Sequence, residues 1–158
     1  MYYPDLMGLI IFCGSLLLML LTVPWQQIER FMLFGIVSGL GIAFLLILIM
    51  DHWLGLWEFH RVDFFYLGRI PLFLSAAWSP TEIFFAYFLS RYQQPFLRYL
   101  LILFIPGVAA GIHFVLGLNQ MLTYQHWNLF GTFLVSLVIH GGLAYFIYQK
   151  YPVRMEIG

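Results

Sequence analysis

Three ionisable residues stand inside long apolar stretches of this sequence: Glu82, His113 and His140. A carboxyl group and imidazole rings that meet in a low-dielectric interior influence each other's proton affinity, and such groups serve as general acids and bases. We therefore take Glu82, His140 and His113 as the candidate catalytic residues. The alternative for each histidine is a neutral ring held by a backbone carbonyl or a hydroxyl. For His140 that hydroxyl is Ser136, four residues earlier on the same helix face.

The residues around Glu82 offer a structural alternative to a catalytic role. Ser79-Pro80-Thr81-Glu82 has the pattern of a helix start, with Ser79 as the N-cap and Glu82 reaching back to the backbone. This pattern predicts a break in the apolar segment near Ser79-Pro80, with a new helix that starts inside the membrane. Broken helices occur where protein or water covers the exposed backbone, and they often mark sites. A cap and a site are therefore compatible here.

A second group of polar residues lies in the segment 51–70, which contains acids, histidines, arginines and tryptophans. Such a mixture is typical of a segment lying in the membrane interface, and a short amphipathic helix is one form it can take. The candidate substrate-binding residues are Trp57, His60 and Asp63 in this segment and Trp78 at the expected break. The acids and histidines do not repeat the spacing of a metal-binding motif, so we predict no metal site and no cofactor.

Composition identifies the environment of these groups. Hydrophobic residues make up 63% of the sequence and charged residues 9%, and the mean hydropathy is +0.90. A soluble domain needs more polar surface than this, so we expect an integral membrane protein with membrane lipids as partners. Basic and acidic residues number 7 each and cancel, which argues against nucleic-acid binding.

Five apolar segments, each close to the ~20 residues that cross a bilayer, predict an all-α bundle of five transmembrane helices. We expect one polytopic domain over 1–158, with spans at 6–23, 31–50, 71–90, 99–118 and 129–149, the third of them broken near Ser79-Pro80. Glycines four residues apart, Gly35 with Gly39 and Gly107 with Gly111, predict faces on the second and fourth spans where another helix packs closely.

Three short motifs resemble those of a family of small multi-pass membrane proteins of spore-forming Firmicutes. They are Leu54-Gly55-Leu56-Trp57 after the second span, Trp78 with Pro80 at the break, and Trp127-Asn128 at the start of the last span. In that family an acid directly follows the tryptophan of the break, whereas here Ser79 holds that place and the acid is Glu82. The resemblance implies a bacterial plasma membrane and no particular activity.

A second resemblance concerns Pro80-Thr81-Glu82-Ile83-Phe84-Phe85, which is similar to the Pro-x-Glu-Glu-x-x-Phe-Phe motif of membrane lycopene cyclases. Those enzymes protonate an isoprenoid chain with an intramembrane acid, and the resemblance implies that role for Glu82. The second glutamate of the motif is Ile83 in this sequence.

Three functions follow as alternatives. The first and most economical is a non-enzymatic accessory protein or complex subunit, with a membrane-protein partner or a second copy packed on the glycine faces. The second is a membrane-embedded enzyme acting on a lipid or isoprenoid, with Glu82 as the acid. The third is a small transporter or channel, which has to be oligomeric because five helices enclose little pore. The sequence contains no nucleophile-elbow, zinc-protease, P-loop or CxxC motif, so nothing in it demands catalysis.

Basic residues predict the orientation of the chain, because loops rich in Lys and Arg stay in the cytoplasm. With five spans, one side of the membrane holds Arg30, Arg91, Arg98, Lys150 and Arg154, and the other holds Arg61 and Arg69. This asymmetry predicts an external N-terminus and a cytoplasmic C-terminus.

Reporter fusions test this orientation. A reporter fused after Gly158 should report the cytoplasm, and a tag before Tyr2 should be accessible from outside intact cells. A C-terminal reporter found outside would mean that a span has been miscounted, with the irregular third segment as the first suspect.

Overall fold

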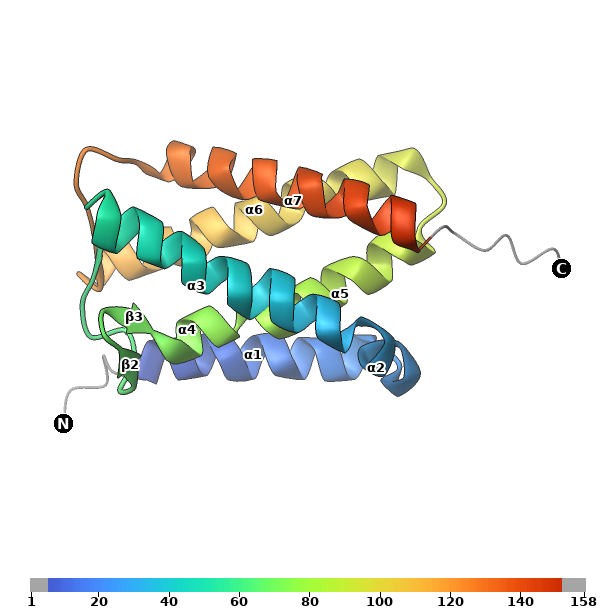
Figure 1. Cartoon of the computed structure of the whole chain (residues 1–158), viewed down its shortest axis with the longest axis horizontal. Coiled ribbons are helices and arrows are strands. Elements are labelled where there is room, and N and C mark those ends of the chain that lie inside the picture. The colour runs from blue at the N-terminus through green and yellow to red at the C-terminus, as the bar shows by residue number, and fades with distance from the viewer. Residues whose placement is uncertain (1–5, 152–158) are drawn as a thin grey trace, which may run out of the picture.

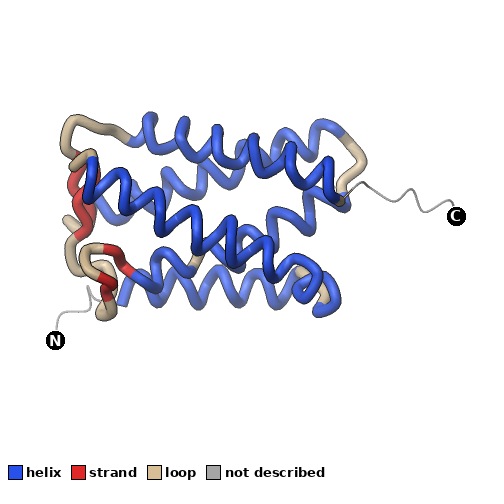
Figure 2. The backbone as a smooth tube through the Cα atoms, viewed as in Figure 1, coloured by secondary structure: helices blue, strands red, loops and turns tan. Residues whose placement is uncertain are grey.

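The structure, a computed structural model, describes residues 6–151; Tyr2, Arg154 and Gly158, which matter to the orientation prediction, lie outside the described residues. The described chain forms an all-α bundle of five helical segments that lie side by side along the long axis of the molecule (Figure 1). Short strands gather at one end of this bundle (Figure 2), which we call the strand end, and the other is the opposite end.

The helices and their bounds follow the chain in order. The first segment is α1 (Met7–Thr22). The second is a continuous helix from Trp25 to Trp53, made of α2 (Trp25–Phe34), η2 (Gly35–Gly41), α3 (Ile42–Ile47) and η3 (Leu48–Trp53), where η2 and η3 are π-helical. The third comprises α4 (Leu72–Ala76) and α5 (Trp78–Arg91), the fourth is α6 (Pro95–Leu118), and the fifth is α7 (Leu129–Lys150).

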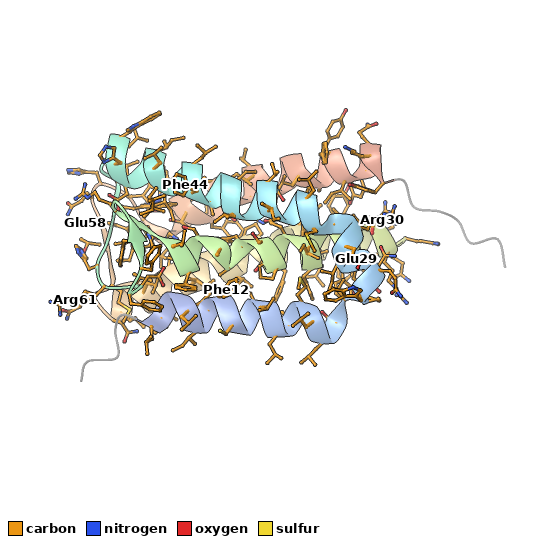
Figure 3. All side chains as sticks on the ribbon, turned by 60° about the horizontal axis from the view of Figure 1, so that its bottom comes forward. Phe12, Glu29, Arg30, Phe44, Glu58 and Arg61 are labelled. Carbon is orange, nitrogen blue, oxygen red and sulfur yellow. The ribbon has the colours of Figure 1, made fainter. Side chains whose placement is uncertain are left out.

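The helices are membrane helices by length and composition. Four of them, from the second segment to the fifth, are long and apolar enough to cross a bilayer. α1 has 16 residues, shorter than the ~20 of a full span, but it lies along the bundle and exposes apolar side chains such as Leu21 at 76%. Figure 3 shows charged Glu58 and Arg61 at the strand end, and Glu29 and Arg30 at the opposite end. The flanks between these ends are apolar, as a lipid-facing surface requires.

Two helices begin before the spans expected within them. The second helix begins at Trp25 rather than near residue 31, because Pro24 ends α1 and sets the backbone for a new helix, while Trp25 Nε1 donates a 2.7 Å hydrogen bond to Glu29. Arg30 therefore lies in a helix and not in a loop. The fourth helix begins at Pro95, four residues before the expected start at 99, with proline again in the first turn.

The third helix is interrupted, as predicted, but at Ala77. This residue is a turn between α4 and α5, two residues before Ser79. Pro80 has no N–H to donate to the carbonyl four residues back, that of Ala76. The last residue of α4 therefore lacks its helical hydrogen bond. The predicted cap is wrong, because α5 already begins at Trp78 and Ser79 is inside it, with no side-chain cap at its start.

The segment 51–70 contains strands and no amphipathic helix, so that expectation is wrong. The second helix runs on to Trp53, and the chain then forms β1 (Trp57–Phe59), which pairs antiparallel with β4 (Leu122–Tyr124) from between α6 and α7. β2 (Tyr66–Leu67) and β3 (Ile70–Pro71) form a small hairpin. Gly55 and Gly68 have φ of +61° and +64°, and such backbone turns the chain too sharply for a helix.

One predicted glycine face packs against a helix and the other does not. A Cβ on Gly39 would lie 2.5 Å from the Ser79 backbone nitrogen, and one on Gly35 would lie 2.4 Å from Ile83 Cγ1. These two glycines therefore let η2 approach α5 almost backbone to backbone. Gly107 and Gly111 have no atom of the described chain within 4 Å of such a Cβ, so the predicted close packing there is wrong within a single copy.

Gly39→Ala should destabilise the protein by about 1–3 kcal/mol, the usual cost of overpacking, since its methyl group meets backbone that cannot move aside. Gly107→Ala is the matched control, because its methyl group enters open space and alanine is the better helix former by about 0.5–1 kcal/mol. Thermal unfolding in detergent measures both. Equal stability of the two variants would contradict the close approach of η2 to α5.

Candidate functional site

Glu82 and His140 lie against each other in the interior of the bundle. His140 Nε2 is 2.9 Å from Glu82 Oε1, and the two side chains are 4% and 3% exposed. The ring N–H is not aligned as a straight hydrogen bond, so the contact is a pair defined by distance. The predicted proximity of Glu82 and His140 is confirmed. The residues next to each of them in the sequence do not indicate this partner.

The hydrogen bonds of His140 determine where its protons are. Nδ1 lies 2.7 Å from the carbonyl oxygen of Ser136, and a carbonyl only accepts, so Nδ1 carries a hydrogen. On a neutral ring Nε2 is then a lone pair that faces a carboxylate oxygen, and two lone pairs repel at 2.9 Å. One member of the pair is therefore protonated, either the ring at Nε2 or the carboxyl group.

Glu82 is not a helix cap. α5 has no side-chain cap at its start, and Oε1 of Glu82 faces α7 instead. Oε2 is buried and has no hydrogen-bond partner among the described residues. The local sequence suggested a cap because Ser-Pro-x-Glu is common at helix starts, but a partner on another helix competes successfully for the carboxyl group.

α7 presents a polar face toward the pair. Thr132, Ser136 and His140 are spaced four residues apart, so they lie on one side of the helix, and all three are buried. Ser136 supplies the His140 partners that the sequence suggested, through its carbonyl and through Oγ at 3.3 Å. The four-residue spacing of these side chains was visible in the sequence and identifies Thr132, which the sequence analysis missed.

His113 belongs to a second polar cluster, nearer the strand end. Its Nδ1 is 2.9 Å from the hydroxyl of Tyr124, and that hydroxyl is also 2.9 Å from Thr132 Oγ1. The Trp57 ring meets the imidazole edge to face, with ring centroids 4.8 Å apart. In the described part of the chain His113 bonds to Tyr124 and not to Glu82, so the two histidines form neighbouring clusters rather than one.

A cavity of about 70 Å³ joins the two clusters. Five of the predicted site residues line it: Glu82, His140, His113, Trp57 and Trp78. Most of the remaining wall is apolar and comes from η2, α3, α6 and α7. The indole N–H of Trp57 is buried and has no partner among the described residues, so the cavity wall contains a free donor as well as the free Glu82 oxygen.

Two surface grooves share wall residues with this cavity. One, of about 270 Å³, lies between α1, α5 and α6 and shares Trp78 and Ile112 with the cavity wall. The other, of about 340 Å³, lies between the second helix and α7 and shares Ser38 and Ile42.

The remaining two candidates, His60 and Asp63, do not line the cavity. His60 Nε2 is 3.2 Å from Thr123 Oγ1 and links the strand segments. Asp63 is 2% exposed, and its Oδ2 accepts a 3.0 Å hydrogen bond from the Leu74 N–H at the start of α4. Its Oδ1 occupies the space where a side chain on Gly8 would begin. Both residues have contacts within the strand end, and their predicted role in substrate binding stays a prediction.

No group of three or more His, Cys, Asp or Glu residues placed to hold a metal ion is found in residues 6–151.

Comparisons with known proteins find no protein-family model, no curated protein and no solved structure that matches the chain. The class of protein is therefore defined by the fold and the site alone: a membrane-embedded all-α bundle with a buried Glu–His pair beside an aromatic cavity.

Asp63 gives a pH-dependent prediction. Burial raises the pKa of Asp63 above its usual 3.8, although the N–H groups of Leu74 and Phe73 act in the other direction. The folded protein then binds this proton more tightly than the unfolded chain, so stability declines as pH rises from about 3.8 through the folded pKa.

Asp63→Asn keeps the acceptor for Leu74 but stays neutral at every pH. Relative to the natural protein, this variant should gain stability as the pH is raised from about 4 to about 7. Thermal unfolding in detergent over that range measures the difference, and a difference that grows toward acid pH would contradict the prediction.

Proposed function

We propose that this protein is a membrane-embedded enzyme that protonates an apolar substrate, a lipid or isoprenoid, with the Glu82–His140 pair as its general acid. The observation that carries the proposal is the 2.9 Å distance between His140 Nε2 and Glu82 Oε1 in the bundle interior, with Nδ1 held 2.7 Å from the Ser136 carbonyl oxygen. General acid catalysis needs a group that holds a proton in reach of the substrate, and a pair buried in apolar surroundings keeps that proton from water.

The surroundings of the pair favour an apolar substrate. Trp78 lines both the cavity that contains Glu82 and the groove on α1, α5 and α6, so an acyl or isoprenoid chain in that groove would contact a residue of the cavity wall. The rings of Trp78 and Phe85 lie beside the His140 ring, with centroids at 6.4 Å and 5.3 Å. Aromatic faces stabilise the carbocation that forms when a double bond accepts a proton.

The proposed step is balanced without a cofactor. Glu82 gives its proton to one carbon of a carbon–carbon double bond, whose π electrons form the new C–H bond and leave a cation on the chain. A neighbouring carbon then loses a proton to the carboxylate, and a double bond forms in a new position or within a new ring. His140 positions the carboxyl group and shares its proton between turnovers.

This chemistry agrees with what the cyclase resemblance implies, although the motif departs from the cyclase pattern. Ile83, in place of the second glutamate, packs at Gly35 and takes no part in the polar cluster. The partner of Glu82 comes from α7 instead. The pair is thus assembled between two helices rather than along one.

An accessory role is the second candidate, and the open glycine faces favour it. Gly107 and Gly111 on α6, and Gly141 and Gly142 on α7, have no atom of the described chain within 4 Å of an added Cβ. Such faces suit close packing with a membrane-protein partner or a second copy. We do not favour a transporter or channel, because the buried residues on the far side of His140 in the described chain, Ala144 and Ile147, are apolar. In each case we propose a bacterial plasma membrane with the N-terminus outside.

Solvent deuterium incorporation tests the enzymatic function. Protein purified in a mild detergent is incubated in D2O with bacterial lipid extract and with polyprenyl and carotenoid chains, and the products are analysed by mass spectrometry. The natural protein should place deuterium on carbon. Glu82→Gln should lower this rate by about 10²–10⁴-fold, because amide cannot give the proton. Combining it with His140→Gln should add little, since coupled residues are not additive.

Glu58→Gln, on β1 and outside the cavity lining, is the control and should keep the full rate. Full incorporation by Glu82→Gln would overturn the proposal. No incorporation by the natural protein, together with a membrane protein that co-purifies in fixed ratio, would establish the accessory role instead.

A further inference from the structure

We infer that a path of hydroxyl groups and bound water connects the Glu82–His140 pair to the strand end of the bundle, while the opposite end is closed. The path rests on the proposed function only for its purpose, which is to keep the proton of the Glu82–His140 pair in exchange with water. Its parts are the polar face of α7, the cavity and the cluster around Tyr124.

The polar face of α7 sets the direction of the path. Thr132, Ser136 and His140 follow each other at one-turn intervals, so the face reaches about 12 Å from His140 toward the strand end at 1.5 Å per residue. Hydroxyl groups donate and accept at once, which lets them pass a proton along. These three are 3%, 8% and 3% exposed, and a buried polar stripe of this length is costly in a membrane unless it is used or fully bonded.

The outer part of the path is a connected set of hydrogen bonds. Tyr124, half-buried on β4, joins His113 and Thr132 through its hydroxyl, and Trp127 Nε1 donates to Thr132 Oγ1 at 3.1 Å. Burial raises the pKa of Tyr124, so the hydroxyl keeps its proton and relays rather than ionises. The strand pair β1–β4 holds Tyr124 over the end of the cavity.

Water completes the inner part, between Thr132 and Glu82. The cavity of about 70 Å³ exceeds several times the ~10–15 Å³ that one water molecule needs. Its wall offers two polar groups without partners among the described residues, the Trp57 N–H and Glu82 Oε2, together with the hydroxyl groups of Ser136 and Thr132. A water molecule is retained where several polar groups meet, and these groups supply both donors and acceptors.

The same face of α7 is apolar beyond His140. Ala144 and Ile147 continue it at 2% and 0% exposed, and they pack in an apolar cluster with Phe85 and Leu89. The titratable groups that face the pair are His113 from α6 and, through Thr132, Tyr124 from β4; the cavity-lining parts of η2, α3 and α4 contribute none in the described chain. Protons therefore reach Glu82 from the strand end.

Hydrogen exchange at His140 tests the path without any substrate. Protein labelled with ¹⁵N-histidine is reconstituted in lipid, and the NMR signals of His140 are assigned by comparison with His140→Gln. The loss of the His140 N–H signals is then followed after transfer to D2O. The Nδ1–H is on the ring whichever partner holds the proton of the pair, so its signal can be followed in either state. Thr132→Val and Tyr124→Phe should each slow the exchange by about tenfold or more, because each removes a hydrogen-bonding link.

Thr132→Ser should restore the natural rate, which separates the role of the hydroxyl from a loss of packing. Ser90→Ala is the matched control near the opposite end, where the Ser90 hydroxyl donates to the Tyr87 carbonyl, and it should leave the exchange unchanged. The inference is overturned if Thr132→Val exchanges at the natural rate, if Ser90→Ala slows exchange, or if the natural protein does not exchange. Each result stands whether or not the protein turns over a lipid, so the path and the proposed function fail separately.

Discussion

The fold depends on one requirement, that a carboxyl group inside a membrane protein has a proton or a partner. Glu82 is 2% exposed and lies on the helix that the others surround, so only a residue from another helix can satisfy it. His140 does so from α7, which places α5 and α7 in direct contact. α5 also meets η2 at Gly35 and Gly39, where no side chain intervenes. The central position of α5 is thus set by small residues on one side and by the acid–imidazole pair on another.

The interruption of the third helix serves the same arrangement. Pro80 removes a backbone donor, and the helix accommodates this at Ala77, where the residues on either side form separate helices. Trp78 follows immediately and lines both the cavity and the surface groove on α1, α5 and α6. Thr81 Oγ1 donates to the Ala77 carbonyl at 2.9 Å and so satisfies one of the backbone groups at the break. A helix broken in this way is tolerated because Ala77 is buried by the surrounding protein, at 3% exposed.

Hydropathy and spacing predict much of this structure, and the failures have physical causes. The apolar segments, the Gly35–Gly39 contact and the similar depth of Glu82 and His140 follow from local pattern. The strands do not, because Trp57 pairs with Tyr124 across the whole of α4, α5 and α6, and no local pattern encodes a partner so distant. The prediction of a cap at Ser79 is wrong because a local motif indicates which hydrogen bonds a residue is able to make. It does not indicate that another helix supplies a different partner. The prediction of close packing at Gly107 and Gly111 is wrong for a similar reason. Spacing locates a face of small residues but does not indicate which helix, if any, covers that face.

The asymmetry of the polar residues bears on which of the functions the bundle can perform. A transporter has to expose its central site to both sides of the membrane in turn, so it needs polar or movable groups on both sides of that site. Here the polar face of α7 ends at His140, and the residues beyond it are packed without exposed surface at Ile147 and Leu89. An acid that protonates a substrate from the bilayer and then takes a proton back needs exchange with water on one side only. A polar path that stops at Glu82 is therefore complete for an enzyme and only half of what a transporter requires.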